Sequence, residues 1–371
     1  MKLTIIGGGL SGLISAILLA RKNWDVTLIE KKEYPFHRVC GEYISNEVIP
    51  FLEKHGLYPT ELGPASLTDF QLSDTSGNTL DMKLDLGGFG ISRYTFDQWL
   101  AKKAVAVGVN LLTGTQVNDV AFSGNKFHVL STKGEMLCDY VLGTFGKRSN
   151  LDRSLNRPFF KKRSPFIGVK YHLKNEKLSD KLIALHNFEG GYCGVSRVEN
   201  GIFNLCYLSQ RSNLKKSDSI ESMEKTVLYQ NPHLKDIFQQ STFLFDQPKV
   251  INEVSFSPKE PVYNHILMTG DAAGMITPLC GNGMAMAIHG AKLLVEHMEN
   301  HRKKNSSREE LESSYSHIWK KTFQKRHWAG RQIQKSLFGA PFSSRLAVSL
   351  GRTSKSAANW LMSKTHGQPF S

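Results

Sequence analysis

The sequence predicts an α/β fold in which a parallel sheet is joined to a second, mainly antiparallel β domain and a helical C-terminal region. Three observations predict this fold. The first thirty residues read as strand, glycine turn, helix and strand, the segment from about 156 to 261 is mostly β-like, and the chain after residue 301 is helical and basic. A chain of 371 residues exceeds one ordinary compact core, so two or three domains are expected.

The N-terminal segment predicts a βαβ unit with a glycine motif at its first turn. A short apolar run reads as a buried parallel strand, and GGGLSG, a GxGxxG motif, follows it. Gly7 permits the tight turn, Gly9 lets the backbone approach a pyrophosphate, and Gly12 lets the helix pack on its strand. The helix N-terminus at Leu10 and Ser11 offers free amides to phosphates.

Glu30 closes the second strand of this unit, DVTLIE. In a Rossmann-like unit an acidic residue at this place accepts hydrogen bonds from the adenosine ribose. Because a carboxylate repels a 2′-phosphate, NADP is not expected as the tightly bound nucleotide. The pattern predicts a dinucleotide site, and a glycine turn without a ligand is the alternative.

A second glycine–acid station, GDAAGMITPLCGNGMAMA, stands at 270–287. The run HILMTGD predicts a strand that delivers Asp271 to hydroxyl groups, and Pro278–Gly283 with the following helix would bring amides toward an anion. FAD needs such a station because its ribityl chain extends away from the pyrophosphate, whereas an NAD-dependent dehydrogenase has no evident need for one. A helix N-terminus near the flavin N1–C2=O edge would also favour reduction. The two stations together favour FAD.

The rest of the chain alternates strand-like and helical segments. Residues 61–90 contain two strand-like runs around a Ser-Gly-Asn turn, residues 96–112 read as helix then strand, and residues 126–146 read as strand, turn, strand. Asn200-Gly201 between alternating runs is a strong hairpin signal, and a helical insert is expected at about 217–230.

These segments predict a discontinuous domain organisation, with the substrate pocket at the interface between two domains. We expect an FAD-binding domain from residues 1–60, 91–155 and 262–300, a substrate-binding β-sheet domain from 61–90 and 156–261, and a basic helical C-terminal region from 301–371.

The C-terminal region concentrates the positive charge of the chain. The whole sequence carries a net charge of +14, and residues 301–371 contain 14 Lys/Arg against 3 Asp/Glu, which gives 14 − 3 = +11. NSSREELESS predicts a helix that starts at a serine cap. The charge suggests an anionic membrane surface or an acidic partner, and a solvated helical face is the alternative. Nucleic acid is not expected, because no zinc-finger spacing or aromatic RNA-binding signature accompanies the charge.

The cysteines and the hydropathy indicate in which cellular compartment the protein is expected. Five cysteines form no CxxC pair and leave one unpaired, which fits a reducing compartment and argues against a zinc site or a disulfide frame. No metal is expected. An uninterrupted apolar stretch of transmembrane length is absent from the sequence. We expect a cytoplasmic protein, with peripheral membrane association through the basic tail as an open option.

At this point the motifs resemble a known family. The chain resembles the FAD-dependent oxidoreductases that include geranylgeranyl reductases, aromatic-ring hydroxylases and flavin-dependent halogenases. Four segments carry the resemblance over most of residues 1–300: GxGxxG with Glu30, RVCGEYIS (38–45), ISRYTFDQWLAKKAVAVGV (91–109) and GDAAGMITPLCGNGMAMAI (270–288). The second and fourth are closest to the geranylgeranyl reductase branch.

The resemblance implies a set of cofactor-binding residues and an electron donor. Arg93 corresponds to a residue near the flavin phosphates and ribityl chain, and NAD(P)H binding transiently, or another protein, would supply electrons. The expected FAD-binding residues are Gly7, Gly9, Leu10, Ser11, Gly12, Glu30, Lys31, Arg38, Arg93, Val117, Gly270, Asp271, Gly281 and Gly283.

Two departures from the family pattern bear on the reaction. In DYVLGTFGKRSN, Phe145 precedes Gly146 where the family usually has Asp-Gly. This weakens a hydroxylase assignment and a simple NADPH-docking scheme. The tryptophan signature of the halogenases is also absent, so halogenation ranks low.

No catalytic residue is assigned, and Cys40 and Glu42 are weak candidates. Cys40 is either close to the flavin or a small buried thiol that packs a loop. Glu42 is either a proton donor in a partly desolvated site or an ordinary surface acid, and the surface acid is favoured. Arg38 either faces a phosphate or substrate anion or forms a surface salt bridge. Cys280 either lines the flavin pocket or, the favoured interpretation, is a structural thiol.

The expected function is hydride transfer from reduced FAD to a carbon–carbon double bond of an apolar, carrier-linked or lipid-linked substrate. A monooxygenase that hydroxylates or epoxidises with oxygen and NAD(P)H is the near alternative, because the same scaffold serves both. A non-catalytic nucleotide-binding protein is the distant alternative. The sequence does not decide the substrate, the electron donor, the catalytic acid or the oligomeric state.

Overall fold

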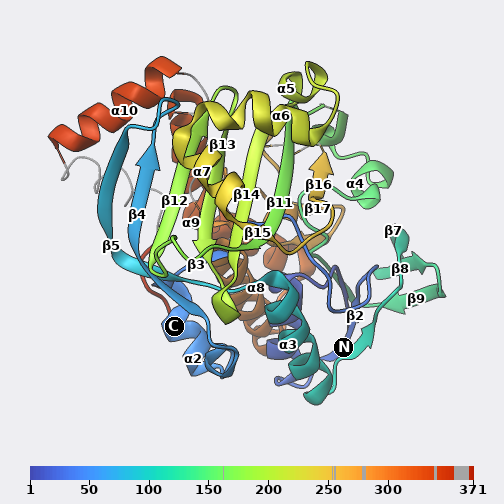
Figure 1. Cartoon of the computed structure of the whole chain (residues 1–371). Coiled ribbons are helices and arrows are strands. Elements are labelled where there is room, and N and C mark those ends of the chain that lie inside the picture. The colour runs from blue at the N-terminus through green and yellow to red at the C-terminus, as the bar shows by residue number, and fades with distance from the viewer. Residues whose placement is uncertain (162, 253, 255, 278–280, 338–340, 355–366) are drawn as a thin grey trace.

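The computed structural model describes the chain except residues 162, 253, 255, 278–280, 338–340 and 355–366. It has two large β-sheets and one small sheet, with helices against both large sheets (Figure 1). The predicted α/β fold is confirmed: one large sheet is almost wholly parallel and the other is mainly antiparallel.

The parallel sheet, called sheet A here, is built around the predicted βαβ unit. Its strands run in the order β17-β18-β10-β1-β2-β6. Their bounds are β1 Lys2–Ile6, β2 Asp25–Ile29, β6 Asn110–Leu112, β10 Tyr140–Gly143, β17 Val262–Tyr263 and β18 Ile266–Met268. Only the edge strand β17 is antiparallel to its neighbour within the described residues. β1 is central, so the turn that follows it lies in the middle of the carboxyl edge, where ligands bind in such sheets.

A helical layer packs on sheet A. Helix α1 (Leu10–Ala20) contacts both α3 (Arg93–Ala106) and α8 (Gly283–Lys304). Leu13, Ile14 and Ile17 of α1 are fully buried, as the broad apolar face of this segment predicts. The helix after the first glycine station and the helix after the second therefore lie side by side.

The mainly antiparallel sheet, called sheet B here, joins segments far apart in the sequence. The order is β15-β11-β14-β13-β12-β4-β5-β3, with β16 paired to β11. The bounds are β3 Tyr43–Ser45, β4 Ala65–Ser73, β5 Thr79–Gly90, β11 Phe166–Lys174, β12 Leu182–Phe188, β13 Gly191–Arg197, β14 Phe203–Gln210, β15 Thr242–Phe243 and β16 Lys249–Asn252. The predicted hairpin at Asn200-Gly201 is confirmed, because both residues have positive φ and β13 pairs antiparallel with β14.

The two faces of sheet B are used differently. Val169, Leu205 and Tyr207 pack in a core with helices α6 and α7, which cross this face (Figure 1). The alternating residues, such as Lys170 and Cys206, point to the opposite face, because successive side chains of a strand alternate. Three short helices accompany the sheet: α5 Arg211–Lys215, α6 Ile220–Thr226 and α7 Pro232–Gln240. The helical insert expected at 217–230 corresponds to α6, and α5 and α7 extend it on both sides.

Strands β7 (Val117–Ser123), β8 (Lys126–Ser131) and β9 (Gly134–Cys138) form a separate small sheet. The predicted strand, turn and strand in this part are confirmed by the β8–β9 pairing. The remaining short helices are α2 Ile49–Lys54 and α4 Asn150–Ser154.

The C-terminal region is helical, as predicted, but it is not only a solvated face. Helix α9 (Arg308–Leu337) begins with a capping pair, in which Ser307 N–H donates to Glu310 Oε2 at 2.8 Å and Glu310 N–H donates to Ser307 Oγ at 3.1 Å. Tyr315 is fully buried and its hydroxyl donates to the Met268 carbonyl of β18 at 2.7 Å. α9 therefore belongs to the main core, whereas α10 (Pro341–Thr353) lies against β4 and β5. No described helix combines the length and the apolar composition needed to cross a membrane.

Candidate functional site

A large cavity lies between sheet A and the face of sheet B that carries Cys206. Its volume is about 1270 Å³, above the roughly 300–1,000 Å³ of an ordinary small-molecule pocket. One end is lined by the glycine turn after β1 and by charged side chains. The other end is lined by apolar side chains of sheet B, among them Leu72, Leu80, Met82, Leu185 and Leu208. The cavity thus has room for a long cofactor and a second, apolar molecule.

Each glycine of the GxGxxG motif is needed for a different geometric reason. Gly7 has a φ of 110°, and a Cβ on it would lie 2.5 Å from the Thr144 carbonyl oxygen. A Cβ on Gly12 would lie 2.1 Å from the Gly7 carbonyl oxygen, so the helix could not pack as closely. A Cβ on Gly9 meets only Arg93 Nη2, at 3.5 Å, because Gly9 faces the cavity. The fold requires Gly7 and Gly12, and Gly9 leaves space for a ligand.

Glu30 is buried and holds the glycine turn. Its Oε2 accepts from Gly8 N–H at 2.8 Å and from Arg38 Nη2 at 3.1 Å, and its Oε1 accepts from Lys32 N–H at 3.1 Å. This structural role was not predicted from the sequence. Glu30 also lines the cavity, so the ribose role expected of it stays a prediction.

Arg38 and Arg93 are held at the cavity wall by one buried carboxylate, Asp97. Arg93 donates from Nε and Nη2 to the two Asp97 oxygens, each at 2.7 Å, and Arg38 Nε donates to Oδ2 at 3.0 Å. Bidentate pairing fixes a guanidinium plane. Arg38 therefore forms a salt bridge with a buried carboxylate and also lines the cavity. The contact with a phosphate or a substrate anion stays a prediction.

The segment around Asp271 contacts the GxGxxG motif directly. Ser11 Oγ donates to Thr269 Oγ1 at 3.1 Å, across 258 positions of sequence. A Cβ on Gly270 would lie 3.3 Å from Ser11 Cβ. Asp271 follows β18 in a short turn and lines the cavity, and within the described part of the chain its carboxylate accepts no hydrogen bond. A carboxylate at a cavity wall that accepts no hydrogen bond from the described residues is suited to hydroxyl groups of a ligand.

The other expected cofactor-binding residues mostly line the same cavity. These are Leu10, Lys31, Val117, Gly281 and Gly283. Gly281 has a φ of 66°, and a Cβ on Gly283 would meet nothing closer than 4.0 Å. Residues 278–280, including the candidate Cys280, lie outside the described residues.

Glu42 is not a surface acid, and that interpretation was wrong. Its side chain is fully buried, where it contacts the Lys170 ammonium, lies 2.7 Å from His172 Nε2, and accepts from Arg93 N–H at 2.8 Å. Burial alone would raise the pKa of this carboxyl, but Lys170 and His172 outweigh burial and hold the pKa at about 2. Glu42 is therefore ionised at neutral pH and has no proton to donate.

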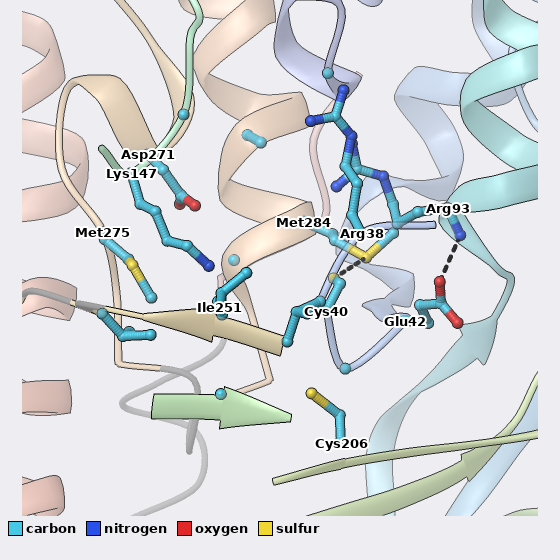
Figure 2. Close-up of a pocket in the computed structure, with 18 of the residues that line it drawn as sticks. Arg38, Cys40, Glu42, Arg93, Lys147, Cys206, Ile251, Asp271, Met275 and Met284 are labelled. Atoms are coloured by element: carbon cyan, nitrogen blue, oxygen red, sulfur yellow. Dashed lines mark hydrogen bonds between the residues drawn. The ribbon is translucent and has the colours of Figure 1, made fainter. Parts of the chain in front are cut away.

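Two further groups that line the cavity were not predicted from the sequence. Lys147 follows β10 and extends its ammonium group into the cavity between Asp271 and Ile251 (Figure 2). Burial lowers the pKa of Lys147, while Asp271 acts in the opposite direction. Cys206 reaches the cavity from β14, and burial raises the pKa of its thiol to about 12. Cys40 lies at the same wall with its sulfur 3.4 Å from Met284 Sδ.

The comparison with protein families decides the class of the protein. The FAD binding domain family matches residues 1–325. The chain belongs to this family. It is an FAD-dependent oxidoreductase, and FAD is its cofactor.

A relative agrees with this assignment, and two solved structures share the fold. The chain is 25% identical over 331 residues to the digeranylgeranylglycerophospholipid reductase of Methanocaldococcus jannaschii, which covers 85% of this chain and 81% of that protein. It is similar to a geranylgeranyl bacteriochlorophyll reductase-like structure from Thermoplasma acidophilum, with a TM-score of 0.77, 16% identity and coverage of 98% and 95%. It is also similar to PqsL of P. aeruginosa in complex with 2-aminobenzoylacetate, with a TM-score of 0.76, 16% identity and coverage of 92% and 98%. These two structural likenesses show the fold.

The residues at the polar end of the cavity fit FAD. The open face of Gly9 and the N-terminus of α1 offer space and amides for a pyrophosphate, and Asp271 offers an acceptor for ribityl hydroxyls. We propose that these groups, with Arg93, hold the cofactor.

Gly9→Val is expected to fold normally and to lose FAD. Gly9 has an ordinary extended backbone with φ −88°, and the added side chain would fill the space proposed for the pyrophosphate. Gly12→Val is the matched variant with the opposite expectation, because its Cβ would collide with the Gly7 carbonyl and destabilise the fold. The ratio of flavin to protein absorbance and the thermal unfolding curve measure the two effects. Normal flavin content in Gly9→Val would refute the placement.

Asp271→Ala is expected to weaken FAD binding by roughly 10- to 100-fold, since a hydrogen bond to a charged group contributes about 1.5–3 kcal/mol. Titration of the flavin-free protein with FAD measures the dissociation constant. Asp119→Ala, which removes an exposed carboxylate of β7, is the control and should bind FAD as the wild type does. Equal affinity of the two variants would contradict the role of Asp271.

Glu42→Gln is expected to lower the free energy of unfolding by ~3 kcal/mol at neutral pH, because the pKa of Glu42 lies at about 2 in the folded protein against an ordinary 4.5. A carboxyl group whose pKa is lower in the folded than in the unfolded state stabilises the fold at pH values above its unfolded-state pKa. This stabilisation is lost as the pH falls toward the folded-state pKa. The difference in the free energy of unfolding between wild type and variant should therefore become smaller as the pH falls from about 5 toward 2. Urea unfolding over this range measures it, with the exposed Glu53→Gln as control. A gap that does not change with pH would count against the ionised Glu42.

Proposed function

We propose that this chain reduces a carbon–carbon double bond of an apolar, lipid-like substrate. The observation that carries the proposal is the continuity of the cavity: its polar end fits FAD and its other end is lined by aliphatic side chains. Reduced FAD, when bound, supplies the hydride. The names of the relatives, among them a digeranylgeranylglycerophospholipid reductase, support a prenyl-lipid substrate class.

The apolar end of the cavity would bind and orient the substrate. Leu72 of β4, Leu80 and Met82 of β5 and Leu208 of β14 present hydrocarbon surface, with no charged group among them. Each methylene that an apolar chain buries contributes ~0.8 kcal/mol, so a prenyl chain gains affinity without polar contacts. The same lining excludes water from the reacting carbons.

The reduction needs a proton as well as a hydride, and Lys147 is the group best suited to hold it. Glu42 has a lowered pKa of about 2 and is ionised at neutral pH. The Cys206 thiol has a raised pKa of about 12, which makes it a weak acid. Lys147 carries an ammonium proton into the cavity, and burial lowers its pKa, so it releases the proton more readily than an exposed lysine. We assign Lys147 as the proton donor to the second carbon of the double bond.

The products distinguish reduction from oxygen insertion. The photochemically reduced protein is incubated under nitrogen with a geranylgeranylated lipid and, separately, in air. Mass spectrometry should show a gain of two hydrogen atoms under nitrogen. A product that forms only in air and gains an oxygen atom would refute the proposal in favour of a monooxygenase.

Lys147→Met is expected to slow substrate reduction by about 10²- to 10⁴-fold, the usual contribution of a positioned acid. Chemical reduction of the bound flavin should be unchanged, because it does not use this proton. Lys249→Met is the matched control, since Lys249 also lines the cavity but is exposed. Stopped-flow measurement of flavin reoxidation by substrate under nitrogen gives the rate. A rate in Lys147→Met equal to that of Lys249→Met would remove Lys147 from the mechanism.

A further inference from the structure

Helix α10 has one face buried and an apolar face exposed. Ser344, Val348 and Gly351 are buried on the side that packs against β5, where a Cβ on Gly351 would lie 2.3 Å from Leu80 Cδ2. On the outward side, Phe342, Leu346 and Leu350 recur at every fourth position and are 80%, 48% and 59% exposed. Ordinary surface helices place polar residues there, and an apolar stripe of this kind marks an interaction surface.

The stripe stands beside the apolar end of the cavity. Ala347, Leu350 and Gly351 of α10 line that end together with Leu80 and Met82 of β5. Leu350 therefore belongs both to the outer surface and to the cavity wall. Figure 1 shows α10 at the border of sheet B, over β4 and β5. Apolar side chains of α10 therefore lie both on the outside of the molecule and at the cavity wall.

The charges beside the apolar stripe of Phe342, Leu346 and Leu350 favour an anionic partner. α10 contains Arg345 and Arg352 and no acidic residue. Arg345 Nη2 donates to Ser76 Oγ at 2.7 Å, and Arg352 Nε donates to the Thr79 carbonyl at 2.6 Å, so both guanidinium groups are fixed at the exposed rim of the helix. An apolar face with cations along one flank fits a helix that lies in the interface of an anionic membrane. A second copy of this chain is a poorer partner, because each copy carries a net charge of +14.

We infer that α10 docks on an anionic lipid bilayer, with Phe342 and Leu346 inserted among the acyl chains. In this position the cavity end beside Leu350 opens toward the bilayer, so a lipid substrate could enter without crossing water. The docking stands independently of the reaction, and only the delivery of substrate rests on the function proposed above.

Co-sedimentation of the full-length, FAD-loaded protein with vesicles tests the docking. The vesicles contain phosphatidylcholine alone or phosphatidylcholine with phosphatidylglycerol. The wild type should bind the anionic vesicles, bind the neutral ones at least tenfold more weakly, and lose affinity as salt is raised. Absence of binding to anionic vesicles would overturn the inference.

Two double variants separate insertion from simple charge attraction. F342D/L346D should lower vesicle affinity at least tenfold. L130D/L137D places the same two added charges on exposed leucines of the small sheet and should bind much as the wild type does. Equal loss in both variants would show charge attraction alone and overturn the inference, as would no loss in either. Flavin content and thermal unfolding confirm that each variant is folded.

A third variant reports insertion without adding charge. The tryptophan fluorescence of Phe342→Trp should shift to shorter wavelength when anionic vesicles are added. Neutral vesicles should cause no such shift. Sedimentation velocity without vesicles examines the rival partner: self-association that F342D/L346D abolishes would assign the face to a second copy and overturn the inference. Reduction of a short, water-soluble alkene should be the same in F342D/L346D as in the wild type, so a failure of the catalytic proposal leaves the vesicle result unaffected.

Discussion

The buried carboxylate of Glu42 is the interaction on which the junction of the two large sheets depends. It joins the loop before β3, the first amide of α3 and the inner face of β11 through Arg93, Lys170 and His172. An isolated buried ion costs several kcal/mol, so the three partners must be present together. Glu42 also has a φ of 54°, an uncommon conformation for a residue with a side chain. The network holds the loop of Arg38 and Cys40 against sheet B, and the cavity lies beside it.

Much of the fold could be predicted because its signals are local. The GxGxxG turn, the Asn200-Gly201 hairpin and the serine cap before α9 each depend on residues a few positions apart, and each is present as expected. The pairing of the two glycine stations was also inferred, although they are far apart in sequence, because an extended cofactor needs both. The contact of Ser11 with Thr269 agrees with that inference.

What the sequence could not indicate depends on contacts between distant segments. Nothing local in RVCGEYIS shows that Glu42 is buried, and only its contacts with β11 reveal it. Lys147 lies beside a departure from the family pattern, but nothing local shows that its side chain enters a cavity. Helix α7 is short and owes its stability to packing on sheet B, where its residues Leu234 and Phe238 are buried. The burial of one side of α9 was hidden by its high positive charge.

One face of β11 and β14 packs in the core and the other faces Glu42 and the cavity. This arrangement has a consequence for the evolution of the chain. Odd-numbered residues of β11 build the core with α6 and α7, and Lys170 and His172 face Glu42. Loss of a single residue within β11 would exchange the two faces of everything beyond it, turning Val169 or Tyr171 toward the ion network and an ammonium toward the core. Natural length variation should therefore gather in the connections between α5, α6 and α7 and be purged from these two strands, whatever substrate a descendant of this chain comes to use.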